Sequence, residues 1–204
     1  MFLLNDLRMK KTHRLEYPFA LEQVRCLSVG DCVLVSGRIF TGRDRLHRFL
    51  AEGGKSPFNL RAGAIYHCGP VVIREKGQWV VCAAGPTTSI REEPYLPEII
   101  RRHALRVIIG KGGMGEGTRK ACAKYGCVYL HAVGGAAQVL ADKIERVAGV
   151  HFLDEFGSAE AMWELVVRDF PVLVTMDARG RSLHERIAAR SKRNLQHLLI
   201  NVKQ

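Results

Sequence analysis

The sequence predicts a single α/β domain in which layered sheets are flanked by helices. Short runs rich in Val, Ile and other strand-forming residues recur along the 204 residues, and Gly- or Pro-containing turns separate them. Two such runs form a hairpin pattern in the first half, whereas strands, glycine loops and helical segments alternate from Val107 onward. That alternation is typical of parallel strands joined by right-handed crossovers.

In the first half, the helix expected after the TGRD segment has the clearest boundaries. Thr41 is expected as its N-cap and Asp44 as a capping acid, and Gly53-Gly54 should end it. The other elements expected here are an extended piece at 15–19, strands at 32–36 and 64–67, and a hairpin at 71–86 around Lys76-Gly77.

In the second half, Pro97 suits the first position of a helix that runs to about His103. Pro171 separates two expected strands, a turn follows at 177–180, and the basic tail from Ser182 is expected to be helical. The remaining expected elements are strands at 107–109, 127–130, 163–167 and 172–176, and helices at 118–125 and from 134 to about 142.

Composition and charge restrict the functional classes. Hydrophobic residues make up 47% of the chain, enough for a core, and the net charge is +11. A basic balance points to an anionic partner: nucleic acid, an acidic protein surface, or a small carboxylate or phosphate. No apolar run is long enough to cross a bilayer, and the first residues lack the order of a signal peptide. We therefore expect a cytoplasmic protein with no membrane partner.

The cysteines give no metal-binding pattern. No Cys-x-x-Cys pair occurs, and Cys122 and Cys127 match only one part of a plant-type iron–sulfur spacing. We expect small buried thiols and no metal or cluster held by this chain.

The stretch GKGGMGEGT at 110–118 resembles a phosphate-binding loop, but Glu116 stands where a second lysine would meet the phosphates. A carboxylate there would repel a nucleotide. Two interpretations remain: a tight turn before a helix, or a loop that binds a carboxylate.

Four residues in Gly- or Thr-containing segments that follow expected strands form the candidate site: Arg43, Thr87, Arg91 and Lys111. Arginine binds carboxylates bidentately and lysine acts as a point charge, so three such cations suit a small dicarboxylate. Each cation alone could equally be a solvated surface charge. The scattered His47, His67 and His131 are expected to be hydrogen-bonded residues of the core and not metal ligands.

The basic tail offers a rival function, a nucleic-acid or nucleotide-binding module. No aromatic residues interleave with its charges, so it lacks a platform on which bases could stack. This argues against nucleic acid as the partner.

Taken together, the segments resemble the β subunit, equivalently the C-terminal domain, of the iron–sulfur-dependent class I fumarate hydratases. The related tartrate dehydratase β subunits share the pattern. The matching segments are SGRIFTGRDRLH, YHCGPVV, AAGPTTSIREEPY, VIIGKGGM, HAVGGAA and DFPVLVTMDARGRSL. They span about residues 15–184, so residues 1–184 are expected to be one domain of this type and 185–204 a basic extension.

The resemblance implies a swivelling β/β/α domain and a hydro-lyase that hydrates fumarate to L-malate, or dehydrates tartrate or a related hydroxy-diacid. It implies that Thr87 is the catalytic base and contacts the substrate, and that Arg43, Arg91 and Lys111 grip the substrate carboxylates. It also implies a [4Fe–4S] cluster held by a partner α subunit, an α2β2 assembly with that partner, and activity only in the complex.

Overall fold

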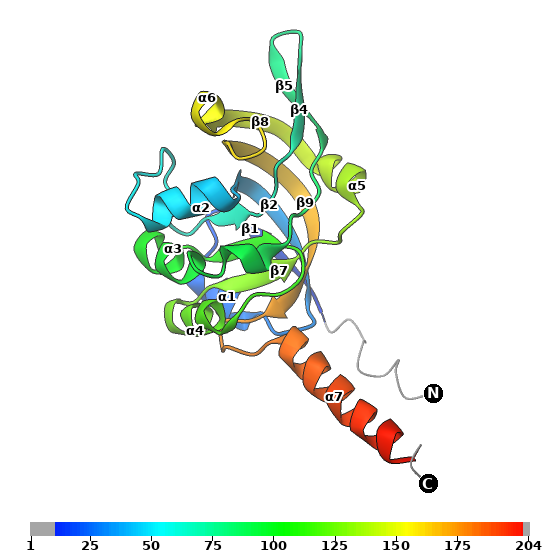
Figure 1. Ribbon diagram of the computed structural model, residues 1–204. Helices are drawn as coiled ribbons and strands as arrows, with labels where there is room; N and C mark the ends of the chain where they lie inside the picture. Colours follow the sequence, from blue (N-terminus) through cyan, green and yellow to red (C-terminus); the bar gives the residue numbers. More distant parts are fainter. Residues whose placement is uncertain (1–10, 202–204) are drawn as a thin grey trace.

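The fold is built around a closed five-stranded barrel (Figure 1). The computed structural model describes residues 11–201; the expectation about the very start of the chain falls on residues 1–10, outside the described residues. Four barrel strands are parallel neighbours, and the fifth runs antiparallel between the last and the first of them. In spatial order they are β2 (Cys32–Thr41), β3 (Ala64–Tyr66), β6 (Val107–Gly110), β7 (Val128–His131) and β9 (Met162–Met176).

Two further strands extend the barrel wall, and a separate hairpin stands away from it. Strand β1 (Thr12–Glu16) pairs in parallel with β2, and β8 (Ile144–His151) pairs antiparallel with β9. Strands β4 (Val71–Glu75) and β5 (Gln78–Ala83) form the predicted hairpin, which projects from the body in Figure 1.

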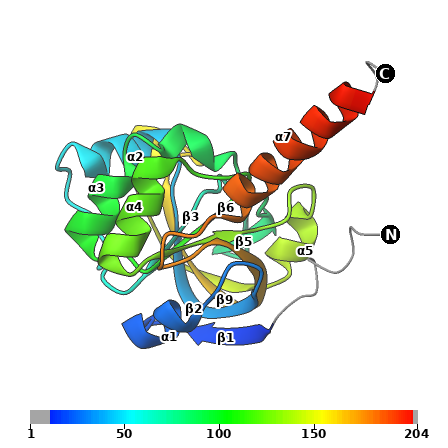
Figure 2. The ribbon, with the colours of Figure 1, turned by 90° about the horizontal axis from the view of Figure 1, so that it is seen from below.

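The barrel interior and the outer face of its parallel strands form two hydrophobic cores. Successive residues of a strand point to opposite faces, so Ala64 and Tyr66 of β3 join the interior core while Ile65 joins the outer one. Three helices cover that outer face on one side of the barrel, as Figure 2 shows: α2 (Asp44–Ala51), α3 (Leu96–His103) and α4 (Glu116–Tyr125). They contribute Leu46, Leu50, Ile99, Ile100, Ala121 and Cys122 to it.

The remaining helices are short, except for the last. They are α1 (Leu21–Cys26), the 3₁₀ turn η2 (Ser89–Glu92), α5 (Ala137–Ala141) and α6 (Leu153–Phe156). Helix α7 (Leu183–Asn201) extends away from the body in both views (Figures 1 and 2). No helix within residues 11–201 is both long and apolar enough to span a bilayer.

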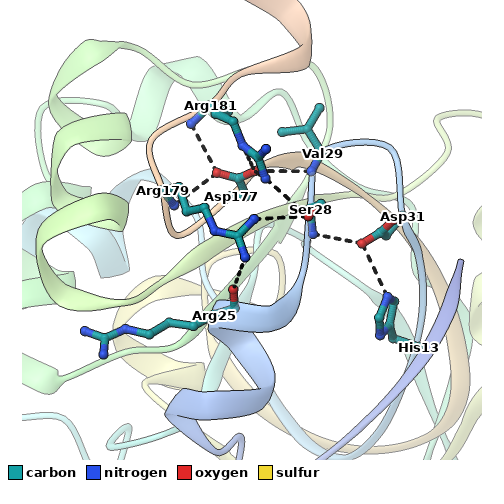
Figure 3. Close-up of polar contacts among 8 residues, drawn as sticks. All are labelled: His13, Arg25, Ser28, Val29, Asp31, Asp177, Arg179 and Arg181. Carbon is teal, nitrogen blue, oxygen red and sulfur yellow. Dashed lines mark hydrogen bonds and ion pairs between the residues drawn. The ribbon is translucent and has the colours of Figure 1, made fainter. Parts of the chain in front are cut away.

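A buried carboxylate fixes the turn between β9 and α7 (Figure 3). Asp177 is fully buried and accepts hydrogen bonds from the backbone N–H of Arg179 at 3.0 Å and from Arg181 Nε at 2.7 Å. It also accepts one from the Val29 N–H at 3.3 Å, and both arginines donate to the Ser28 hydroxyl. The turn predicted at 177–180 is therefore tied to the segment before β2, which fixes where α7 begins.

The α/β class and the flanking helices are confirmed, as are the parallel strands around the glycine loop. The strand order is that of a closed mixed barrel, and the swivelling β/β/α arrangement remains a prediction. The domain boundary at 184 also remains one; α7 begins at Leu183.

Two local predictions were wrong. Thr41 does not cap α2: it is the last residue of β2, and its hydroxyl donates to the Ala161 carbonyl and accepts from the Trp163 N–H. Pro171 does not divide two strands, because β9 runs through it. At that point β9 is paired with β2 only, between the end of its β8 pairing at Val167 and the start of its β7 pairing at Leu173, so the missing N–H of proline is tolerated.

Candidate active site

The loops that carry the four candidate residues meet at one end of the barrel. The parallel strands β2, β3, β6 and β7 share their carboxyl ends there, which is where sites of α/β proteins gather. Arg43 follows β2, and Lys111 follows β6. Thr87 and Arg91 lie on the segment after β5, which returns to the barrel through a hydrogen bond from the Thr87 N–H to the His67 carbonyl at 2.7 Å.

Thr87, Arg91 and Lys111 are brought together directly. The Arg91 guanidinium donates to the Thr87 hydroxyl at 3.0 Å. The Lys111 N–H donates to the Thr87 carbonyl at 3.2 Å, and the Ser89 N–H donates back to the Lys111 carbonyl at 3.0 Å. These bonds fix the glycine loop beside the segment that carries the threonine and the arginine.

Arg43 joins this group through its neighbour in the sequence. Asp44 forms an ion pair with Arg91 at 3.1 Å, so the start of α2 is attached to the Thr87 segment. Arg43 itself lies 3.5 Å from the Glu160 carboxylate. A Cβ on Gly69 would lie 2.6 Å from the Ala159 carbonyl and 3.0 Å from the Arg43 guanidinium, so only glycine fits where these loops converge.

The site carries less free positive charge than three cations would suggest. Asp44 pairs with Arg91 and Glu160 with Arg43, whereas Lys111 has no acidic side chain within ion-pair distance among residues 11–201. Its aliphatic stem runs along Gly134, where an added Cβ would approach it to 3.1 Å. Sequence reasoning missed both acidic partners, and Glu160 is more than a hundred residues away from the arginine that it faces.

The second half of the glycine loop holds a carboxylate of the protein itself. Glu93 accepts hydrogen bonds from the backbone N–H of Gly115 at 2.7 Å and of Thr118 at 3.0 Å, and from the Thr118 hydroxyl at 2.7 Å. A Cβ on Gly115 would lie 2.6 Å from this carboxyl group. The N-terminus of α4 is thus already neutralised by an anion, which removes the basis for a phosphate site there.

A buried hydroxyl network lies behind Thr87 and Lys111. The fully buried Ser89 accepts hydrogen bonds from the Lys111 N–H at 3.1 Å and from the Tyr129 hydroxyl at 2.9 Å. Its hydroxyl also lies 2.8 Å from His67 Nδ1, which joins the buried ring to this network. Burial, and then the nearby His47, hold the pKa of His67 well below its usual range. As expected, His67 is a hydrogen-bonded core histidine.

The described cysteines do not form a metal site. Cys68, Cys122 and Cys127 are buried, and burial raises the pKa of the Cys68 thiol to about 12. Within residues 11–201, no group of three or more His, Cys, Asp or Glu side chains is placed to hold a metal ion. The expectation of buried thiols therefore holds for these three, whereas Cys26 is exposed and Cys32 and Cys82 are partly exposed.

Two cavities lie away from the candidate residues. One, of about 400 Å³, is lined by residues that include Arg14, Ser36 and Asp169; the other, of about 530 Å³, lies beside Phe58 and Arg102. Neither is lined by Thr87 or Lys111. Whether the four residues enclose a hollow for a diacid remains a prediction.

Comparisons with known proteins give one consistent result. The family model described as "Fumarase C-terminus" matches residues 5–187. The chain is 52% identical over 182 residues to "Putative fumarate hydratase class I" of Geobacillus stearothermophilus. The matched region is 89% of this chain but only 35% of that protein. It therefore spans about a third of that relative.

Two β subunits match over most of their length. "Putative L(+)-tartrate dehydratase subunit beta" of Methanocaldococcus jannaschii is 40% identical over 193 residues, 91% of this chain and 99% of the relative. "L(+)-tartrate dehydratase subunit beta" of Escherichia coli K12 is 34% identical over 177 residues, 86% and 87% of the two chains.

Proposed function

Since the chain belongs to the fumarase C-terminal family, we propose that it is the β subunit of a hydro-lyase that reversibly hydrates fumarate to L-malate. The observation that carries this proposal is the joining of Thr87, Arg91 and Lys111 at the carboxyl ends of the barrel strands. Arginine and lysine side chains at such a place suit the carboxylates of a short diacid.

In this proposal Thr87 is the base and the three cations bind carboxylates. A hydroxyl is a weak base, so its deprotonated form needs stabilisation from a nearby cation. Arg91 supplies this, because it already donates to the Thr87 oxygen at 3.0 Å. In the malate-to-fumarate direction, Thr87 Oγ1 would accept the proton from the carbon beside a carboxylate, while Lys111 and Arg43 hold the diacid in place.

The [4Fe–4S] cluster belongs to the partner in this proposal. In support of this, residues 11–201 hold no group of three or more His, Cys, Asp or Glu side chains placed for a metal ion. The roles assigned to Thr87, Arg43, Arg91 and Lys111 concern substrate binding and proton transfer only.

Two exposed apolar side chains beside the candidate residues support a partner chain on this face. Ile90, next to Arg91, is 49% exposed, and Val133, next to the Gly134 that packs against Lys111, is 61% exposed. Apolar side chains exposed around a polar site are typical of a protein interface. We propose that a cluster-bearing α subunit covers this face, in an α2β2 assembly, and completes the site.

Tartrate is the second candidate substrate. The relative that this chain covers almost completely is named as a tartrate dehydratase β subunit, whereas the more similar fumarate hydratase is covered by only 35%. Fumarate and tartrate chemistry both require two carboxylates to be gripped, so the four site residues do not distinguish them.

Reconstitution tests the proposal. The chain is mixed under anaerobic conditions with a cluster-bearing α subunit of the family. With L-malate as substrate, fumarate formation is followed by ultraviolet absorbance; with L-tartrate as substrate, oxaloacetate formation is measured. We expect no turnover by either chain alone and turnover by the mixture. Turnover by the isolated β chain, or none by the mixture with either substrate, would refute the proposal.

A further inference from the structure

One buried carboxyl group at the site has no hydrogen-bond partner. Glu92, the last residue of η2, is fully buried, and neither of its carboxyl oxygens has a hydrogen-bond partner within residues 11–201. His47 Nδ1 lies 3.5 Å from its Oε2. A buried carboxylate in this position would lose its hydration without gaining strong hydrogen bonds.

His47 does not supply a compensating positive charge. It is fully buried, and its Nδ1 lies 2.9 Å from the Arg43 carbonyl, which can only accept a hydrogen bond. Nδ1 therefore carries the proton of a neutral imidazole. Burial lowers the pKa of His47 to about 4, so the ring stays neutral around pH 7.

The carboxylates and guanidinium groups around Glu92 already form ion pairs that do not include it. Asp44 pairs with Arg91 at 3.1 Å and Glu160 lies 3.5 Å from Arg43, one carboxylate for each guanidinium. Glu92 is a third carboxyl group beside two guanidinium groups. The charged and titratable groups that face it are Asp44 and His47 of α2, Arg43 before α2, Arg91 of its own turn, and Glu160 before β9.

Burial, and then the nearby Asp44, raise the pKa of Glu92 to about 8. Glu160 raises the pKa further, while Arg91 and Arg43 act against them. The direction agrees with the geometry, because the fully buried carboxyl group has no hydrogen-bond donor in contact within residues 11–201.

We propose that Glu92 is an uncharged carboxylic acid whose proton keeps the candidate site positive, and that losing this proton weakens the binding of dicarboxylates. With Glu92 protonated, Arg43, Arg91 and Lys111 face two carboxylates and leave one positive charge; with Glu92 ionised, the sum is zero. Glu92 acts through the field at the arginines and does not touch the substrate. It is a positioning residue, and its role in turnover depends on the function proposed above.

The proton itself is measured on the full chain, without any partner. The protein is labelled with ¹³C at the glutamate side-chain carboxyl groups and titrated by NMR between pH 4 and pH 10. We expect one carboxyl resonance to shift near pH 8 and to be missing in Glu92→Gln. If every glutamate of the wild-type chain is ionised by pH 6.5, the proposal is wrong, whether or not the variant folds.

Binding is measured with succinate, a C4-dicarboxylate that cannot be hydrated. Succinate is doubly charged at both pH 7 and pH 9, so a change in affinity reports on the protein. We expect the wild-type dissociation constant to rise about tenfold between pH 7 and pH 9, and that of Glu92→Gln to change less than about twofold. Absent succinate binding at pH 7, or the same pH dependence in both proteins, would overturn the proposal.

The complex with the α subunit separates this inference from the proposed function. KM should rise above pH 8 in the wild type with kcat little changed, and stay level in Glu92→Gln. The control Glu52→Gln, an exposed acid of the segment that ends α2, should keep the wild-type profile. If the complex turns over neither malate nor tartrate, the proposed function fails, while the carboxyl titration and the succinate affinities still decide the role of Glu92.

Discussion

The carboxylate of Glu93 is hydrogen-bonded to both the backbone and the side chain of Thr118, at 3.0 Å and 2.7 Å. This pair attaches the segment that carries Thr87 and Arg91 to the N-terminus of α4. The glycine loop between Lys111 and α4 is therefore held at both ends: by the backbone bonds of Lys111 and by the Glu93 carboxylate. A loop so rich in glycine gains its shape from these contacts.

We predict that Glu93→Gln destabilises the protein by about 1–3 kcal/mol, since charge-assisted bonds to the helix N-terminus become weaker and the new NH₂ group faces the N–H of either Gly115 or Thr118. Urea denaturation of the full chain measures the change. The matched control is Glu116→Gln, an acid of the same helix whose side chain is 64% exposed and pairs with Lys120. Equal effects of the two substitutions would contradict the prediction.

The sequence predicted some features of this region and not others. The strand before the loop, the helix after it and the nearness of Thr87 and Lys111 follow from local patterns and from the resemblance. The carboxylate that fills the loop does not: Glu93 is followed by Pro94 in a polar segment, and nothing local shows that it faces Gly115. Such partners are fixed by the topology of the chain, which brings segments together across long sequence distances.

The same holds for the errors in the fold. Strand β8 was missed because its residues are partly exposed and alternate irregularly, with register shifts against β9. Strand β9 was divided at Pro171, although its pairing with β2 alone at that point leaves room for a proline. Asp44 was assigned to helix capping because its ion pair with Arg91 is invisible to spacing rules.

Thr87 can be tested as the base in the reconstituted complex. Thr87→Ala should lower kcat by about 10²–10⁴-fold, the usual contribution of a positioned base, while Thr87→Ser should keep a large part of it. The backbone bonds of residue 87 to His67 and Lys111 need no side chain, so the thermal unfolding of both variants should stay near that of the wild type. A fully active Thr87→Ala complex would show that the base is another group.

Lys111 should act mainly in binding. Its ammonium has no acidic partner within the described part of the chain, so its charge is free for a substrate carboxylate. Lys111→Met keeps the stem along Gly134, and we expect KM to rise about tenfold or more with kcat changed much less. Lys120→Met, which removes an exposed lysine of α4, is the control and should leave both constants unchanged.

Gly110 should tolerate no side chain. A Cβ there would lie 1.9 Å from the Ser89 hydroxyl, 3.0 Å from His67 Nδ1 and 3.1 Å from the Tyr129 hydroxyl. Gly110→Ala should destabilise the protein by about 2–4 kcal/mol, measured by urea denaturation, because it displaces a buried hydrogen-bond network. Adding Ser89→Ala removes the closest atom, so the effect of Gly110→Ala in that background should be smaller. If the destabilising effects of the two substitutions simply add, the predicted clash between residue 110 and Ser89 is contradicted.

The two buried histidines predict a loss of stability in acid. The pKa of His47 is lowered to about 4, and that of His67 lies well below its usual range. Below pH 6.5 both rings take up protons in the unfolded chain but not in the folded chain. The contribution of the two neutral rings to the free energy of unfolding is therefore complete above pH 6.5, and it falls as the pH drops toward 4. Each ring should lower the free energy of unfolding by about 1.4 kcal/mol per pH unit in that window.

Glu92 acts in the opposite direction, so the histidine contribution must be isolated by variants. The raised pKa of Glu92 stabilises the folded state below pH 4.5, and this contribution is lost as the pH rises toward 8. Urea denaturation at pH 5.5 and pH 7 should show a smaller pH dependence for His47→Gln than for the wild type, by about 1.4 kcal/mol. His197→Gln, which changes an exposed histidine of α7, should retain the wild-type dependence. If the two variants behave alike, the pKa of His47 is not lowered in the folded state and the prediction is wrong.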